Sequence, residues 1–218
     1  MRVTIVADVL GIENNGTTIT AVNFINSLKS KGHEVSVVCP DINKTGLYGY
    51  YVVPSLNLGI FNNYVKKNNI NLAKADSKII TDAIRNADIV HVMMPFFLGT
   101  KAARIAKRLG KPVTAGFHVQ AENFTNRIFM MDMPLANLLT YKLFYRALYR
   151  YVDAIHYPTQ FIREVFETHA GETNGYVISN GVHKAFKPRL APKPKHLDGK
   201  YVILFTGRYS REKSHKIL

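Results

Sequence analysis

The fold is decided by residues 3–39, VTIVADVLGIENNGTTITAVNFINSLKSKGHEVSVVC. This stretch begins with a continuous apolar run, 3–7, and ends with a second one, 35–39, and such runs are typical of strands buried on both faces. Between them, apolar residues recur near helical spacing across 19–28, and Gly32 is expected to end that helix. A strand, a helix and a strand within about 40 residues form a βαβ unit, in which the two strands are parallel.

Strands and helices continue to alternate beyond this unit. Further strands are predicted at 51–53, 88–92, 112–116, 153–157 and 176–178, and further helices at 73–86, 100–109, 134–151 and 160–169. Alternation of this kind implies a parallel sheet sandwiched by helices. The expected fold class is therefore α/β, with a doubly wound, Rossmann-like parallel sheet.

Length and composition exclude several classes of protein. The chain has 218 residues, of which 47% are hydrophobic, so it can bury a sizeable core and is far too apolar to be disordered. A single cysteine, Cys39, excludes an internal disulfide framework and a cysteine-based zinc cluster. The eight histidines show no H-x-H or H-x3-H pairing, so we expect no metal site.

Location and partners are predicted from the start of the chain and from its charge. Met1 leads directly into the first strand without a secretory leader, and no apolar run approaches the ~20 residues that span a bilayer, so we expect a cytoplasmic protein. The chain carries 29 Lys and Arg against 15 Asp and Glu, a formal net charge of +14. This surplus favours a polyanionic partner: nucleic acid, anionic lipid headgroups or phosphorylated ligands.

The composition changes near residue 184. Residues 184–200 contain three prolines among Lys and Arg residues and are predicted to form a semi-rigid linker. The following run, 201–206, resembles a buried strand. We therefore expect a first domain at 1–183, the linker, and then, over 201–218, the first strand and helix start of a second domain, which these two elements cannot complete.

Five short motifs occur in an order that resembles a known family. They are the Gly16 loop, Gly32-His33-Glu34-Val35, Phe117-His118-Val119-Gln120-Ala121-Glu122-Asn123, Ser179-Asn180-Gly181-Val182, and Gly207-Arg208-Tyr209-Ser210-Arg211-Glu212-Lys213. Together they resemble the retaining glycosyltransferases of the two-domain GT-B type, in the large group called family 4 or group 1. The last two motifs are the most specific, because they stand on either side of a Pro-rich linker.

The resemblance implies a function. Such enzymes transfer a hexose from a UDP- or GDP-linked nucleotide sugar, here to a membrane lipid or a cell-envelope glycan, and need neither cofactor nor metal. They pair two Rossmann-like domains and hold the nucleotide sugar mainly in the C-terminal one. This chain would then be the N-terminal, acceptor-binding domain with a truncated donor-binding domain. It would be inactive alone, because the transition state needs both walls of the cleft.

Three residues are predicted to face the acceptor. His118 follows the predicted strand 112–116, at the edge where open α/β sheets bind ligands, and its imidazole can donate to a hydroxyl or, when protonated, stabilise a phosphate. With the resemblance, it is the catalytic candidate, although not as a general base. Gly16 precedes a helix whose positive end could receive an anion or a sugar hydroxyl. Glu122 is expected to bind acceptor hydroxyls. A loop histidine and a plain turn are the structural alternatives.

Two cations are predicted to face the donor. Arg208 and Lys213 follow the predicted strand 201–206, and the resemblance implies that they neutralise the charge growing on the departing nucleoside diphosphate. The alternative is that both are merely solvated side chains.

The predicted helix 134–151 suggests a membrane contact. Its Lys142, Arg146 and Arg150 are spaced i, i+4, i+8 and form one basic stripe. The stripe beside it consists of Leu138, Tyr141, Tyr145 and Leu148. Such a pattern suits a helix on an anionic membrane and predicts a peripheral enzyme on the inner membrane face that makes a glycolipid. The alternative is a core helix with one solvated face.

Two rival functions remain open from the sequence. The chain could be a non-catalytic, basic membrane-binding module, or one half of a split glycosyltransferase whose second chain supplies the missing domain. Nucleic-acid binding is suggested by charge alone. Because no helix-turn-helix, RNP or finger pattern is present, we expect no nucleic-acid partner.

Overall fold

The computed structural model describes residues 1–8, 10, 16–56, 73–126, 130–182, 186–190, 192–207, 209 and 215–217. The chain divides into two units, Met1–Ser179 and Asn180–Leu218. The first unit thus ends at Ser179, whereas the sequence predicted that the first domain ends at residue 183.

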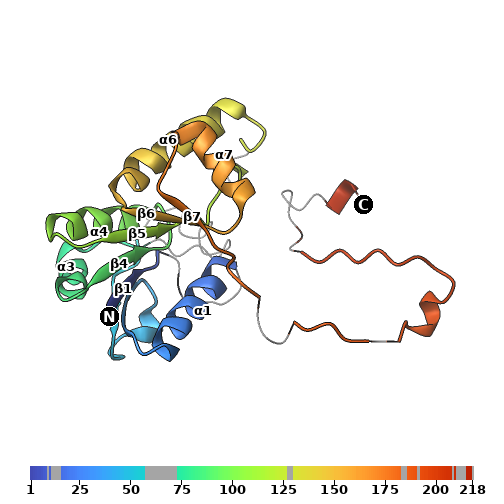
Figure 1. Ribbon diagram of the computed structural model, residues 1–218, viewed down its shortest axis with the longest axis horizontal. Coiled ribbons are helices and arrows are strands. Elements are labelled where there is room, and N and C mark those ends of the chain that lie inside the picture. Colours follow the sequence, from blue (N-terminus) through green and yellow to red (C-terminus); the bar gives the residue numbers. More distant parts are fainter. Residues whose placement is uncertain are drawn as a thin grey trace. The chain divides into compact units, whose positions relative to one another are not determined.

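Within the described residues, the first unit contains a seven-stranded parallel sheet (Figure 1). Its strands are β1 (Arg2–Val6), β2 (Glu34–Cys39), β3 (Tyr50–Val52), β4 (Ile89–Val92), β5 (Val113–Gly116), β6 (Ala154–Tyr157) and β7 (Gly175–Val177). They follow the order β3-β2-β1-β4-β5-β6-β7, and every pairing is parallel. The chain therefore winds first toward β3 and then back across β1 toward β7, which confirms the doubly wound α/β fold and places a switch point between β1 and β4.

Helices connect these strands as the alternation predicted. They are α1 (Gly16–Ser30), α3 (Ser77–Arg85), α4 (Phe97–Arg108), α5 (Ala121–Thr125), α6 (Pro134–Ala147) and α7 (Gln160–Ala170), with 3₁₀ turns η1 (Ile42–Lys44) and η4 (Tyr149–Tyr151). The start of α3 is fixed by Asp76, whose side chain accepts the amides of Lys78 and Ile79. The single helix predicted for 134–151 divides at Leu148 into α6 and η4.

The sheet separates two apolar cores. The larger core lies against α3, α4, α6 and α7, and the smaller one lies against α1. Side chains alternate between these faces along each strand. On β5, Val113 and Ala115 belong to the larger core, so Thr114 and Gly116 face the side of α1.

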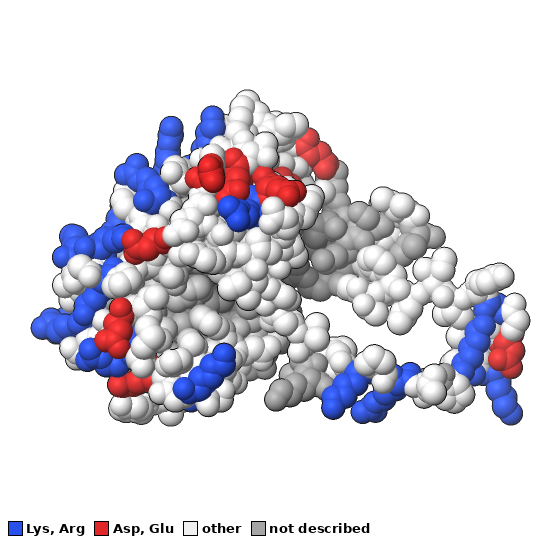
Figure 2. All heavy atoms as spheres, in the orientation of Figure 1, with Lys and Arg blue, Asp and Glu red and all other residues white. Residues whose placement is uncertain are grey.

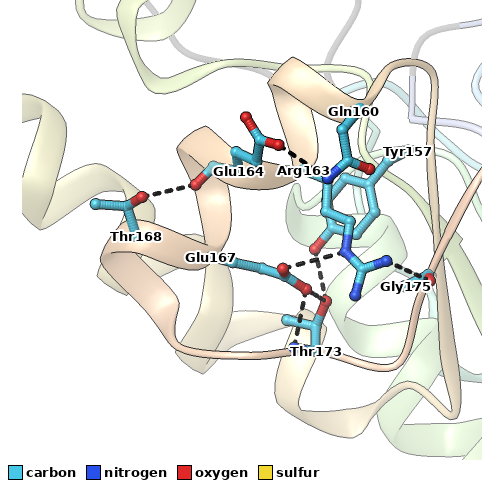
Figure 3. Close-up of polar contacts among 8 residues, drawn as sticks. All are labelled: Tyr157, Gln160, Arg163, Glu164, Glu167, Thr168, Thr173 and Gly175. Carbon is cyan, nitrogen blue, oxygen red and sulfur yellow. Dashed lines mark hydrogen bonds and ion pairs between the residues drawn. The ribbon is translucent and has the colours of Figure 1, made fainter.

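A polar network holds the edge strand β7 against α7 (Figure 3). The Arg163 guanidinium donates to Glu167 at 3.1 Å and to the Gly175 carbonyl at 3.2 Å. Glu167 also accepts from the amide and the hydroxyl of Thr173, at 3.0 and 2.7 Å. Gly175 leaves room for a neighbouring ring, since a Cβ there would lie 2.5 Å from Cε2 of Tyr157. The network therefore fixes the segment through which the chain passes from α7 into β7.

The second unit corrects one prediction. Residues 186–190 and 192–194 are exposed and form no regular element, as predicted for the linker. The strand predicted for 201–206 is absent, and its apolar side chains from Tyr201 to Phe205 are exposed. A strand needs a hydrogen-bonded neighbour, and nothing in the described part of this unit supplies one. The prediction of a strand here is wrong for this chain.

Candidate active site

His118 lies at the carboxyl edge of β5, on the sheet face that carries α1. Phe117 before it is 1% exposed and is anchored in the larger core, with its ring centroid 4.5 Å from that of Phe166. The half-buried imidazole of His118 folds back over Gly116, where a Cβ would lie 2.3 Å from Nε2. The missing side chain at position 116 is therefore what makes room for the ring.

Two further histidines lie on the same face of the sheet. In the strand register His91 of β4 is opposite Thr114, and His156 of β6 is opposite Gly116. The His118 and His156 rings meet edge to face at 5.5 Å. His156 donates through Nε2 to the Ile178 carbonyl at 2.6 Å, because a carbonyl can only accept. This hydrogen bond holds the His156 ring in place beside the His118 ring.

His91 is buried behind this pair. Its Nδ1 lies 2.8 Å from the Thr114 hydroxyl, and its ring packs against Phe24 of α1 at 5.0 Å. Neither His91 nor His156 was predicted from the sequence to belong to the site. The available signal was the alternation of strand residues, which places both on the face of Gly116.

Burial decides the charge of these imidazoles. Burial, with a smaller effect of His156, lowers the pKa of His118 to about 4. Burial, together with His118 and His156, lowers the pKa of His91 to about 3. Both rings are therefore neutral at pH 7. A neutral imidazole offers one donor and one acceptor, which suits a hydroxyl group better than a phosphate.

Gly16 opens α1 at the same edge of the sheet. The carboxyl ends of β1 and β5 lie on one edge because the strands are parallel, and α1 covers the face on which His118 lies. Gly16 is exposed, and a Cβ there would meet no atom within 4 Å. The preceding loop, 11–15, lies outside the described residues.

Glu122 has a structural partner. Its Oε2 accepts the hydroxyl of the buried Tyr141 at 2.6 Å and so ties α5 to α6. Burial, reinforced by Glu122, raises the pKa of Tyr141 above its ordinary value. The predicted binding of acceptor hydroxyls by Glu122 would have to use the rest of its carboxylate.

Asp8 is a buried carboxylate that the sequence indicated only as the end of the first strand. It is 1% exposed and accepts the amides of Leu98 at 2.9 Å and Gly99 at 3.1 Å. It thereby caps α4, whose own N-cap residue, Phe96, supplies no side-chain hydrogen bond. Burial outweighs these two amides and raises the pKa of Asp8 to about 7. Asp8 joins β1 to α4 at the switch point.

The structure exposes the basic half of the predicted membrane stripe but not all of its apolar half. Lys142, Arg146 and Arg150 are all exposed, as the hypothesis requires. The prediction of the apolar half of the stripe is wrong, because Tyr141 and Leu148 are buried in the larger core. The exposed apolar side chains of α6 lie on another line of the helix: Leu135, Leu139 and Leu143. The donor-side candidates Arg208 and Lys213 lie outside the described residues.

Among the described residues, no group of three or more His, Cys, Asp or Glu could hold a metal ion. No described helix has the length and apolar character needed to cross a bilayer.

These features define an α/β domain whose candidate site lies at the carboxyl edge of its sheet. The sequence pattern of Glycosyltransferase Family 4 matches residues 14–186, and the chain belongs to this family. It is 27% identical over 146 residues to a GDP-mannose-dependent alpha-mannosyltransferase of Corynebacterium glutamicum, an alignment that covers 63% of this chain and 34% of that protein.

Solved structures resemble the chain at lower identity. MurG of Acinetobacter baumannii is 14% identical with a TM-score of 0.41, over 72% of this chain and 41% of that one. An alpha-glucosyltransferase in complex with UDP and a 13-mer DNA is 14% identical with a TM-score of 0.45, over 84% and 43% of the two chains. The chain thus spans about a third of the mannosyltransferase and less than half of these two structures.

Proposed function

We propose that the first unit is the acceptor-binding half of a retaining GT-B glycosyltransferase. It would direct a hexose from a UDP- or GDP-linked sugar to a hydroxyl of a membrane lipid or a cell-envelope glycan. Membership of Glycosyltransferase Family 4 supports glycosyl transfer. The donor named for the C. glutamicum relative makes GDP-mannose the first donor to test.

The neutral imidazole of His118, seated on Gly116 at the carboxyl edge, is the observation that carries this proposal. One ring nitrogen accepts and the other donates, so the ring can orient an acceptor hydroxyl without taking its proton. In a front-face reaction the bond from the anomeric carbon to the diphosphate breaks and the bond to the acceptor oxygen forms on the same face. The hydroxyl proton then passes to the leaving diphosphate.

The other predicted residues would bind the acceptor and the leaving nucleoside diphosphate. The start of α1 at Gly16 and the free part of the Glu122 carboxylate would bind further acceptor hydroxyls. Arg208 and Lys213 would neutralise the charge on the leaving nucleoside diphosphate. The sugar nucleotide is a substrate, and no cofactor is required.

A peripheral position on the cytoplasmic face of the membrane fits a lipid acceptor. The exposed cations Lys142, Arg146 and Arg150 would face anionic headgroups, each contributing about 1 kcal/mol near such a surface. The chain's net charge of +14 acts in the same direction.

The second candidate function is one half of a split, two-chain enzyme, or a non-catalytic membrane-binding module. The exposed cations Lys142, Arg146 and Arg150 favour the membrane-binding module. In the split enzyme a second polypeptide would supply the donor-binding wall, and it should then copurify with this chain.

A transfer assay distinguishes these functions. The chain, alone and with any copurifying polypeptide, is incubated with radiolabelled GDP-mannose or UDP-glucose and a membrane lipid extract. Transfer by the chain with its partner, lost in His118→Ala and retained in the matched His33→Ala, supports the acceptor role. Transfer that survives His118→Ala contradicts it. Membrane binding without transfer under any condition favours the non-catalytic module.

A further inference from the structure

A groove of about 940 Å³ runs between α4 and α6, outside the candidate active site. Its lining changes character along α4. At the start of this helix the walls are aromatic, with Phe96, Phe97 and Phe124. The Phe96 and Phe124 rings lie 6.4 Å apart, and Phe124 meets Phe144 of α6 edge to face at 6.0 Å. One end of the groove is therefore an apolar slot.

The other end of the groove is cationic. Lys101, Arg104, Lys107 and Arg108 of α4 all line it, and none of the described lining residues is Asp or Glu. Lys107 is paired with Asp153, and Arg104 lies 5.3 Å above the ring of Tyr151. Arg108 is exposed and forms no ion pair among the described residues. A positive field therefore remains over the second half of α4.

Large apolar side chains in and beside this groove are exposed. Phe97 of α4 is 66% exposed and Leu143 of α6 is 58% exposed, and Leu139 continues the line one turn away. Figure 2 shows Lys and Arg side chains gathered over the part of the first unit where Figure 1 places α3, α4 and α6. Apolar side chains framed by cations are the surface expected of a helix that rests at a membrane interface.

We propose that the groove between α4 and α6 binds an anionic phospholipid of a membrane surface, with its acyl chain on the phenylalanines and its phosphate over Arg104 and Arg108. Charge complementarity selects the lipid. Arg104 and Arg108 form no ion pair among the described residues and need an anion, and the aromatic slot beside them needs an apolar tail. This lipid is an anchor and not the acceptor, because His118 faces the α1 side of the sheet whereas the groove lies among the helices of the other face.

The test is partition of the full chain onto vesicles at 0.15 M salt, where screening leaves mainly short-range contacts. Vesicles of phosphatidylglycerol and phosphatidylcholine are compared with phosphatidylcholine alone. Binding is expected with the anionic vesicles, and Arg104→Glu/Arg108→Glu should weaken it about tenfold or more. The matched pair Lys29→Glu/Lys31→Glu changes the net charge equally at two exposed sites, in the last turn of α1 and directly after it, on the other face of the sheet, and should weaken it by less than about threefold.

A second pair of variants tests the apolar end. Phe97→Ser/Leu143→Ser should weaken partition about tenfold, whereas Ile42→Ser/Tyr48→Ser, which alters two exposed apolar residues elsewhere, should leave it unchanged. Thermal melting followed by circular dichroism verifies that each variant is folded. Equal losses in the groove and control pairs, or equal partition onto neutral vesicles, would overturn the proposal.

One further pair separates this proposal from the predicted α6 stripe. If Lys142→Glu/Arg146→Glu abolishes binding while Arg104→Glu/Arg108→Glu does not, the stripe is the membrane contact and the groove proposal fails. Glycosyl transfer is not required for any of these measurements.

Discussion

His118 and Gly116 form one structural unit: the imidazole occupies the space that a side chain at position 116 would fill. A Cβ on Gly116 would lie 2.3 Å from Nε2 and 2.6 Å from Cδ2 of His118. The next strand adds the ring of His156, which His118 meets at 5.5 Å. The orientation of His118 is thus set by its own strand and by the neighbouring one.

Gly116→Ala should displace the His118 ring from its position against residue 116. The added methyl group cannot share the space, and an overpacked site of this kind costs about 1–3 kcal/mol of folding free energy. The freed imidazole should be better solvated, so its pKa should rise from about 4 toward the ordinary value of 6.5. A histidine NMR titration measures this shift. The matched Gly16→Ala, which meets no atom, should leave the titration of His118 unchanged.

Asp8→Asn should change the pH dependence of stability. The folded-state pKa of Asp8 is about 7 and its ordinary value is 3.8, so the folded chain keeps a proton that the unfolded chain releases. The contribution of Asp8 to the free energy of unfolding therefore falls as the pH rises from about 4 to 7. The variant lacks this proton, so its deficit relative to the wild type should shrink over that window. Urea denaturation at pH 4.5 and 8 measures it, and an equal deficit at both would refute the shift.

Glu167→Ala should loosen β7. The substitution removes the acceptor of Arg163 and of the Thr173 amide and hydroxyl, in a part-buried site, and should cost about 1–3 kcal/mol. Glu164 lies one turn away on the same helix, but among the described residues its carboxylate accepts only from exposed Gln160. Glu164→Ala is therefore the matched control and should cost less than about 0.5 kcal/mol. Chemical denaturation compares them, and similar losses would mean that the network adds little.

Self-association should arise from the apolar run Tyr201–Phe205. Its side chains are exposed, and unpaired apolar backbone is prone to pair between chains. The full chain should therefore form dimers or larger species at micromolar concentration, whereas a chain ending at residue 183 should stay monomeric. Light scattering distinguishes the two, and identical masses for both would dismiss the idea.

The elements could be predicted from the sequence because their signals are local. The apolar runs at 3–7 and 35–39 are strands because both of their faces are buried, and the helix over 160–169 follows from its own apolar spacing. The run at 201–206 has the same local character, yet it remains exposed. The runs at 3–7 and 35–39 have neighbouring strands to pair with, whereas no described strand pairs with 201–206. No local pattern reveals whether such a neighbour is present.

The candidate site was predictable only in part. His118 was indicated by its place after a strand and by a family motif. His156, Asp8 and the groove were not, because each depends on contacts between distant parts of the chain, such as Asp8 with the amide of Leu98, ninety residues away. The apolar stripe of α6 was misplaced for a related reason. Spacing defines the faces of a helix but does not say which of them packs against the sheet.

The most direct test of His118 as an acceptor-binding residue is a two-part NMR titration of the histidine rings in the full chain. We predict that His118 titrates near pH 4. At pH 7, adding soluble hexosides or lipid-headgroup polyols should shift the His118 signals and leave those of His33 unchanged. A His118 that titrates near 6.5 and does not respond to any hydroxyl-bearing acceptor would contradict it.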